Sequence, residues 1–524
     1  MSLLERRRSL IGAFKGFIRT VLGIPPISLI SCIGDKDAIS YKIYGNSIQD
    51  GTPTPDAPIE VESVGEKTVN LFDYDNQTWT TGLLNASTGN ITTNVHYKTT
   101  DYLDILEPAK TYTVSFMQDY ICTSYTSNRI CYYDENKIFI QCAYNGTYSE
   151  TQRYSYQLDV PFNAKYIRYS VRITDTEIQI EEGTTATDYE PYGKYKIPVK
   201  VSGKNLFNIN DLRLGSNVKN LTINENEFSF EKTLVNTSSE AFYDIYLKAG
   251  TYRFSGSAMS SNGKDLIGIA VKIGSIFIIN HSSEGSNKGC NFSFTLTEDN
   301  TYRIGFYSQY DAVAGTVTTF KNIQLEYGSV ATKYEPYINS IITKNIFLNE
   351  PLRKIGNYAD YIDFENSKVV RLNRTRKVTS SALYFYNNIL TNIAVFRSTQ
   401  RIFSDSNQGN VYDTINKCDK LKYRNGGSIS TVAENSGEFL ALRTGAFYVS
   451  FNKDRFVDGI TEEKALEYLN NLNATVIYPL ATPKEETIEL PKLPTFKGTT
   501  VYSIDTIIQP SNMEVIYYSK ERSV

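Results

Sequence analysis

Short segments in which hydrophobic and polar residues alternate make up much of the chain. Residues 111–116 read TYTVSF and residues 166–172 read YIRYSVR. The same alternation returns at residues 251–255 and 301–306. A period of two is typical of strands that have one face on a core and the other in water. Short strands of this kind, separated by turn residues at regular spacing, predict a mainly β protein of antiparallel sandwiches.

A phrase that closes a strand-rich stretch occurs twice, 145 residues apart. Residues 178–192 read IQIEEGTTATDYEPY and residues 323–337 read IQLEYGSVATKYEPY. A short opener follows each copy, KNLF at 204–207 and KNIF at 344–347, and NLF at 70–72 lies upstream of both. The opener spacings of 135 and 140 residues suit a β-sandwich and exceed a solenoid repeat. The sequence therefore predicts tandem antiparallel β-sandwich domains, with the jelly roll as the expected topology.

These repeats divide the chain into six predicted segments. They are an N-terminal helical attachment segment (1–30), a strand and Pro-rich connector (31–66), jelly-roll 1 (67–193), jelly-roll 2 (194–337), a divergent β-sandwich 3 (338–484) and a C-terminal strand-rich extension (485–524). The third domain closes with YPLATP at 478–483 in place of the Glu-Pro-Tyr phrase. It also holds a predicted helix over 461–472, which has two glutamates in its first turn. We expect the extension to add strands to this domain or to exchange them with a neighbour.

The first segment has the period of an amphipathic helix, which Gly23 and the following prolines end. Lys15 and Arg19 interrupt its apolar stretch, which argues against a signal peptide and against stable membrane insertion. A basic amphipathic helix could lie on a membrane surface. We favour packing against copies of itself or against a partner protein. The predicted attachment residues are Leu10, Phe14, Phe17 and Val21.

Composition and charge narrow the range of functions. A formal net charge of −3 gives no long-range attraction to nucleic acid. The two histidines lie in different repeats, and no Cys/His cluster has zinc spacing. Cys122, Cys131 and Cys142 share one domain, so a disulfide among them stays open. We favour free thiols in a protein made in a reducing cytoplasm.

Tyrosine is the unusual residue, with 40 copies against a single tryptophan. Tyrosine suits half-buried strand positions and is also enriched at interfaces. The candidates for stacking on a sugar ring are Trp79, in the polar segment 76–82, and Tyr125, Tyr132 and Tyr133, near predicted turns. For Trp79 a partly buried loop anchor is an equal alternative. A structural Ca²⁺ would suit a jelly roll, but the sequence identifies no metal ligands and we expect no other cofactor.

The repeated Glu-Pro-Tyr phrase has a structural and a functional interpretation. Its residues are Tyr189, Pro191 and Tyr192 in the first copy and Tyr334, Pro336 and Tyr337 in the second. The structural interpretation is an interdomain joint, because proline fixes the direction in which the chain leaves the last strand and tyrosines cover the junction. The functional alternative is an aromatic platform for a ligand. We favour the joint, since ligand sites more often use variable loops.

Several phrases in combination resemble one family of phage proteins. They are GNSIQDGTPTPDAP at 45–58, the Asn-Leu-Phe openers, the closing phrases and YPLATP at 478–483. Together they are similar to tail-associated structural or receptor-binding proteins of phages and prophages of gut Firmicutes, which are built from jelly rolls like carbohydrate-binding modules. The resemblance covers about residues 27–520. It implies a virion protein, made in the host cytoplasm, that assembles with other virion proteins and contacts host-surface glycan.

We do not expect an enzyme. Tail depolymerases use paired carboxylates, and no pair here stands out from a solvated face. The sequence also lacks G-x-S-x-G and Gly-rich phosphate motifs. The prediction is a tail, baseplate or fibre protein that attaches to glycan. We expect a homotrimer, because several individually weak contacts made together give a higher avidity. The alternative is a purely architectural virion protein that binds only virion partners, and a polysaccharide depolymerase is less favoured.

Overall fold

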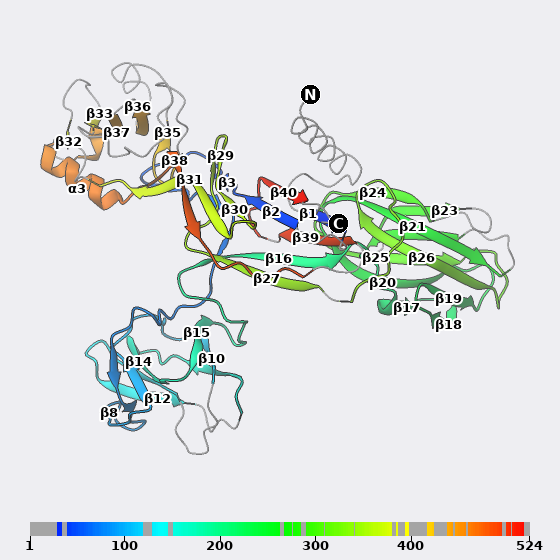
Figure 1. The fold of residues 1–524 in the computed structure, drawn as a ribbon, viewed down its shortest axis with the longest axis horizontal. Helices are drawn as coiled ribbons and strands as arrows, with labels where there is room; N and C mark the ends of the chain where they lie inside the picture. The colour runs from blue at the N-terminus through cyan, green and yellow to red at the C-terminus, as the bar shows by residue number, and fades with distance from the viewer. Residues whose placement is uncertain are drawn as a thin grey trace, which may run out of the picture. The chain divides into compact units, whose positions relative to one another are not determined.

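The computed structural model confirms the predicted mainly β fold (Figure 1). It describes residues 29–33, 39–118, 128–144, 150–261, 267–274, 276–283, 290–308, 310–339, 341–379, 384–385, 393–397, 417–423, 438–443, 446–456, 459–494, 499–504 and 506–517. The predicted N-terminal helix, with Leu10, Phe14, Phe17 and Val21, lies outside these residues, as does Tyr125. Within the described ranges, no helix is long and apolar enough to span a membrane.

The chain forms two compact units. One comprises residues 65–197 and 347–351, and the other comprises residues 1–64, 198–346 and 352–524. We call residues 68–194 module 1, residues 204–337 module 2 and residues 378–474 module 3. The strands of the sheets that connect the modules are called the hub.

The hub joins strands from opposite ends of the chain. β1 (Leu29–Ile33) pairs with β39 (Thr499–Ile504), and β2 (Ile39–Tyr44) pairs with β40 (Asn512–Tyr517), so blue and red strands lie side by side in Figure 1. One sheet has the order β1-β39-β16-β27 and another has the order β34-β38-β31-β30-β2-β40. The predicted C-terminal extension therefore adds its strands to sheets of its own chain. The other hub bounds are β3 (Ser47–Ile48), β4 (Glu62–Ser63), β16 (Tyr195–Gly203), β27 (Ile342–Leu348), β28 (Lys354–Ile355), β29 (Tyr358–Ala359), β30 (Tyr361–Asp363), β31 (Lys368–Lys377), β34 (Lys417–Cys418) and β38 (Thr475–Thr487).

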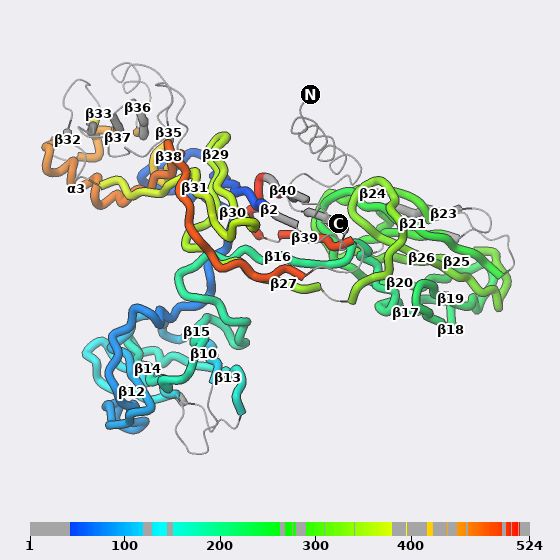
Figure 2. The backbone as a smooth tube through the Cα atoms, viewed as in Figure 1, coloured from blue at the N-terminus to red at the C-terminus, as the bar shows by residue number. Residues whose placement is uncertain are grey.

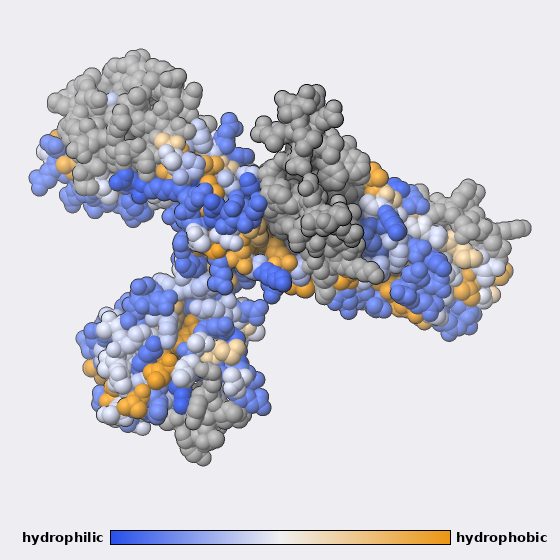
Figure 3. All heavy atoms as spheres, viewed as in Figure 1, coloured by the Kyte–Doolittle hydropathy of each residue, from blue (hydrophilic) through white to orange (hydrophobic). Residues whose placement is uncertain are grey.

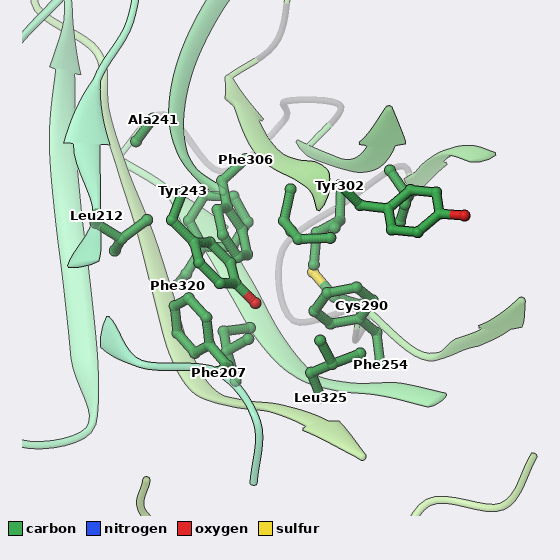
Figure 4. Packing of buried hydrophobic residues seen from close by; sticks show 14 of the residues in the cluster. Phe207, Leu212, Ala241, Tyr243, Phe254, Cys290, Tyr302, Phe306, Phe320 and Leu325 are labelled. Atoms are coloured by element: carbon green, nitrogen blue, oxygen red, sulfur yellow. The ribbon is translucent and has the colours of Figure 1, made fainter. Parts of the chain in front are cut away.

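Module 2 is a sandwich of two five-stranded sheets, ordered β18-β19-β26-β21-β24 and β17-β20-β25-β22-β23. Its core is rich in aromatic rings: Phe207 lies 5.2 Å from Tyr243 and 5.3 Å from Phe306, between ring centroids (Figure 4). Because Phe207 belongs to the opener, the first residues of the module are fixed by its core. The bounds are β17 (Arg213–Leu214), β18 (Val218–Ile223), β19 (Glu227–Lys232), β20 (Ser239–Leu247), β21 (Gly250–Ser260), β22 (Ile267–Ile273), β23 (Ile276–Ser283), β24 (Phe292–Leu296), β25 (Asn300–Ser308) and β26 (Val317–Tyr327).

Module 1 repeats this plan with a smaller second sheet. Its sheets are ordered β13-β10-β15 and β12-β11-β14-β9-β6, and the latter matches β23-β22-β25-β20-β17 strand for strand along the chain. The opener residue Phe72 packs against Tyr169, with 5.5 Å between ring centroids. β5 (Glu66–Lys67) directly precedes the module. The bounds of the module's own strands are β6 (Trp79–Thr81), β7 (Leu83–Leu84), β8 (Ile91–Thr92), β9 (Tyr97–Thr100), β10 (Thr111–Met117), β11 (Arg129–Tyr133), β12 (Phe139–Tyr144), β13 (Arg153–Asp159), β14 (Tyr166–Arg172) and β15 (Thr176–Glu182).

Module 3 contains the predicted helix, which the structure confirms as α3 (Glu462–Leu472). Thr461 caps it by accepting a hydrogen bond from the Lys464 amide, and Asn473 ends it in the left-handed conformation. Its buried face packs with Val449 and Phe451 of the neighbouring sheet. That sheet has the order β32-β33-β37-β36-β35. The bounds are β32 (Tyr384–Phe385), β33 (Ile393–Arg397), β35 (Lys422–Tyr423), β36 (Phe439–Arg443) and β37 (Ala446–Asn452).

Each module lies between two strands that neighbour each other in a sheet. Module 1 lies between β5 and β16, module 2 between β16 and β27, and module 3 between β31 and β38. The modules therefore follow one another along the chain, but each is held at both of its ends. Such a connection requires that the first and last residues of a module lie close together.

Candidate functional site

In modules 1 and 2 the opener and the closing phrase are fastened together by one buried asparagine. In module 2 the Asn205 side chain donates to the carbonyls of Ile323 and Glu335, and its oxygen accepts from the amides of Phe207 and Leu325. Asn70 makes the corresponding four hydrogen bonds in module 1. All four hydrogen-bonding positions are used, which is what burial of an amide requires. We call these residues the clasp.

A second polar network fixes the closing phrase itself. The Gln324 amide donates to Glu326 (2.8 Å) and Thr332 (3.2 Å), while the Thr332 hydroxyl donates to Glu326 (2.6 Å). Gln179, Glu181 and Thr187 repeat these contacts in module 1. The two networks explain why both phrases contain Gln-x-Glu and Ala-Thr.

The predicted joint residues flank these networks. The Glu335 carboxylate accepts from the backbone and side chain of Thr499, at 2.8 and 2.9 Å, which ties module 2 to the hub strand β39. In module 1, Glu190 pairs with Lys196 at 2.6 Å and accepts from the Val69 amide. The tyrosines and prolines line clefts beside the phrases. The cleft of module 1 includes Tyr189, Pro191 and Tyr192, and that of module 2 includes Tyr334, Pro336 and Tyr337.

These two clefts occupy equivalent places but differ in size and chemistry. That of module 1 has about 400 Å³ and is lined by Asp73, Asp75 and Glu177 among its polar residues. That of module 2 has about 90 Å³ and carries Asn208 and Asn210 where module 1 has the two aspartates. Among the residues described, no group of three His, Cys, Asp or Glu side chains has a geometry suited to a metal ion.

The predicted glycan-binding aromatics lie in different environments. Trp79, in β6, is half-buried against Tyr74, and the Lys98 ammonium lies 4.3 Å from its ring centroid. The predicted alternative was a partly buried anchor in a loop; Trp79 is partly buried but lies in a strand. Tyr132 and Tyr133 require a correction: they lie in β11, not near a turn, and are only 0% and 3% exposed. Because alternate side chains of β11 face the core and the residues that cover its other face, neither ring reaches solvent, and neither can stack on a sugar.

A hairpin covers the outer face of the five-stranded sheet in module 1. After β6 the chain forms the β7–β8 hairpin, whose Leu84 amide donates to Ser170 and whose Leu84 carbonyl accepts from Arg129, at 2.9 and 2.6 Å. Tyr133 donates to the Gly89 carbonyl in the same hairpin. Leu84 packs in a small cluster with Cys131 and Tyr133. This face of module 1 is therefore capped.

The equivalent segment of module 2 takes another course. After β17 the chain forms the β18–β19 hairpin, and β19 pairs with β26 of the opposite sheet, from Glu227↔Lys321 to Glu231↔Val317. Figure 2 allows the tube to be followed from β17 through β18 and β19 to β20. The hairpin thus extends the opposite sheet and does not cover the face of β17-β20-β25-β22-β23. We call this the open face.

One half of the open face is built around Phe242. The Arg303 guanidinium lies 4.0 Å from the Phe242 ring centroid, and Arg213 lies 5.1 Å from it. Both arginines donate to Asp244, at 2.9 and 2.7 Å. The Arg303 hydrogen bonds hold the pKa of Asp244 below its usual value. Phe242 and Asp244 point away from the core because Ala241 and Tyr243, between and beside them in β20, are buried.

The other half of the open face is built around Lys272. Its ammonium lies 4.7 Å from the ring of Phe277 and 4.9 Å from that of Tyr307, and it pairs with Glu240 at 3.2 Å. Burial, with the Glu240 carboxylate beside it, raises the pKa of Tyr307. The face therefore offers aromatic rings beside charged hydrogen-bonding groups, an arrangement that can contact both the C–H surface and the hydroxyls of a sugar. The visible surface of the molecule also mixes hydrophobic and hydrophilic residues in small patches (Figure 3).

Comparison with known proteins gives no family assignment. No model of a protein family matches the chain, and no curated protein matches it significantly. Among solved structures, the chain is similar to the N-terminal CBM22-1-CBM22-2 tandem domain from Paenibacillus barcinonensis Xyn10C, at 9% identity and a TM-score of 0.22, over 50% of this chain and 98% of that one. It is also similar to a structure of infectious bursal disease virus Gt strain, at 9% identity and a TM-score of 0.13, over 62% of this chain and 84% of that one. At such low TM-scores neither likeness bears on the function.

Proposed function

We propose that the protein is a structural component of a phage virion, in the tail, baseplate or fibre, and that it presents its β-sandwich modules for attachment to host-surface glycan. The phage assignment rests on the resemblance of residues 45–58, the openers and the closing phrases to phage tail proteins. The attachment function is supported by the open face of module 2.

The open face carries the proposal because module 1 serves as an internal reference. In module 1 the β7–β8 hairpin covers the outer face of its five-stranded sheet. Leu84 of the hairpin and Tyr133 of β11 are both buried where the hairpin meets the sheet. In module 2 the hairpin joins the opposite sheet, and the rings of Phe242 and Tyr307 on the outer face keep part of their surface in solvent. Individual glycan contacts on such a face are weak, so a homotrimer assembled with other virion proteins would supply the avidity.

Cell binding by the full chain tests the proposal. The chain should be used whole, because β1 and β2 are part of the hub and a fragment that starts after them would lose these strands. A fluorescent full-length protein is expected to bind a subset of gut Firmicutes strains. The binding should disappear when surface polysaccharide is stripped enzymatically from those cells.

Two outcomes would contradict the attachment function. The first is no binding to any strain by a confirmed oligomer, which would favour a purely architectural virion protein. The second is binding that survives removal of polysaccharide, which would favour a protein receptor. Release of reducing sugar from the polysaccharide would instead favour a depolymerase.

A further inference from the structure

A groove of about 340 Å³ lies at one end of the core of module 2. Its walls come from β20, from the closing phrase, and from the hub strands β16 and β39. Tyr246, Tyr337 and Ile338 supply apolar surface, and Asp211 supplies a carboxylate. The hydrogen bonds between Glu335 and Thr499 hold the closing phrase against β39 beside this groove.

The Tyr243 hydroxyl gives the groove an unusual feature. Tyr243 is 2% exposed and lines the groove, yet its hydroxyl has no hydrogen-bond partner among the described residues. Burial raises its pKa well above the usual value, so the group stays a neutral donor, and Asp211 and Tyr337 are the groups that act on it electrostatically. The ring packs beside Phe207 and Phe306 (Figure 4). A phenylalanine would keep this packing without burying an unsatisfied hydroxyl, which folding alone disfavours.

We propose that this groove binds one ring of a saccharide, with a sugar hydroxyl accepting from Tyr243 and a second one donating to Asp211. The volume is at the lower end of the range for small-molecule sites. Tyrosine and aliphatic walls match the C–H face of a sugar, and a convergent donor and acceptor match its hydroxyls. The choice of ligand class rests on the proposed function, whereas the location of the site rests on the groove and on Tyr243.

The test uses the full-length protein and free monosaccharides as probes. Galactose, glucose, N-acetylglucosamine and rhamnose are each examined by saturation-transfer NMR. At least one sugar should receive magnetisation, and Tyr243→Phe should weaken its binding about tenfold or more, as loss of one buried hydrogen bond would. Tyr132→Phe is the matched control, because the Tyr132 hydroxyl is also buried without a partner among the described residues but lies in the core of module 1.

The possible results distinguish a failure of the groove site from a failure of cell attachment through the open face. Transfer to none of the four sugars, or equal binding by Tyr243→Phe and the parent protein, would overturn the groove site. An equal loss in Tyr132→Phe would also overturn it, because the effect would then not be local. Cell binding by the open face is scored independently, so it can persist when the groove site fails.

A separate observation concerns two cysteines in module 1. Cys131 of β11 and Cys142 of β12 lie directly opposite each other in an antiparallel pair, and both are free thiols. Directly opposed residues have a Cα separation that a disulfide can span. Cys142 is the half-buried member, and its hydrogen bond with Cys131 lowers its pKa. The more exposed sulfur is thus also the one more easily converted to the nucleophilic thiolate.

We infer that Cys131 and Cys142 form a disulfide when the protein meets an oxidising medium. With oxidised glutathione, the Cys142 thiolate attacks one glutathione sulfur and releases a glutathione thiolate. Cys131 then attacks the mixed disulfide, gives up its proton and releases the second glutathione. Two protein thiols are oxidised and one glutathione disulfide is reduced, so the exchange balances.

Mass spectrometry after incubation with oxidised glutathione tests this inference. The native full-length protein should yield a peptide cross-linked between Cys131 and Cys142 as the main product. The buried Cys290 and Cys418 should remain alkylatable after unfolding. In Cys131→Ser the Cys142 thiol should instead keep a glutathione adduct. Absence of the cross-linked peptide, or a stable glutathione adduct on Cys142 of the parent protein, would overturn the inference.

Discussion

Modules 1 and 2 share a framework and differ in one hairpin. The sheet β12-β11-β14-β9-β6 of module 1 has the same strand order as the sheet β23-β22-β25-β20-β17 of module 2. Both modules also have the asparagine clasp and the Gln-x-Glu network. In module 1 the segment after β6 folds over the outer face of that sheet, whereas in module 2 the segment after β17 extends the opposite sheet. One connection therefore decides whether a sheet face is covered or available, while the shared residues maintain the framework.

The equivalent clefts beside the closing phrases also differ in their surface residues. The positions that are Asp73 and Asp75 in module 1 are Asn208 and Asn210 in module 2, so the same backbone place carries charge in one copy and amides in the other. The framework residues of the two modules are nearly identical, and the surface residues around them differ.

The largest effect is expected when the clasp is removed. Asn205→Ala deletes four buried hydrogen bonds and leaves their backbone partners unsatisfied, which should lower the free energy of unfolding of module 2 by about 4 kcal/mol. Asn70→Ala should cost module 1 a similar amount. Urea denaturation followed by limited proteolysis would measure both. The exposed Asn291→Ala should change stability by less than about 0.5 kcal/mol, and an equal loss there would contradict the clasp.

A somewhat smaller effect is expected when the cap of module 1 is weakened. Leu84→Ala removes a fully buried side chain between the hairpin and the sheet, and should cost about 3 kcal/mol. Amide exchange should quicken in residues 83–92 first. The comparison residue is Phe277 of β23, which lies on the open face beside Lys272 and is 50% exposed. If Phe277→Ala were as costly as Leu84→Ala, the open face of module 2 would also have to be covered.

The smallest effect concerns the ion pairs on the open face. Asp244 has a lowered pKa in the folded state because of Arg303, so its contribution to stability is present above the unfolded pKa of about 3.9 and is lost as pH falls through the lower folded value. Because Asp244 and both arginines are partly exposed, the contribution should be below about 1 kcal/mol. Asp244→Asn should flatten the stability profile in this acid range only. A flattening at neutral pH would contradict the assignment.

Local patterns predicted the local structure. Alternating segments became strands, and a Thr cap followed by two glutamates became the start of α3. The repeated phrases also contained the signal for the clasp, because Asn70 and Asn205 stand at the same place in both openers. The alternation alone does not show that a polar side chain is buried, so it does not predict the role of these two asparagines.

Non-local pairing accounts for what the sequence did not predict. The partners β2 and β40 lie at opposite ends of the chain, and no period or turn connects them. The destination of the hairpin after β6 or β17 depends on which sheet offers a partner. Tyr132 and Tyr133 were predicted to lie near turns, but they lie in β11, which has covered surfaces on both sides.

Attachment through the open face of module 2 is tested by comparing how three full-length proteins bind to glycan-bearing cells. They are the parent chain, the open-face double variant Phe242→Ala/Tyr307→Ala, and Phe162→Ala, which removes an 85% exposed ring elsewhere in module 1. We predict that the double variant loses at least about tenfold in affinity, as removal of stacking rings should cause, while Phe162→Ala binds like the parent. Equal binding by all three proteins would contradict a role for the open face in attachment.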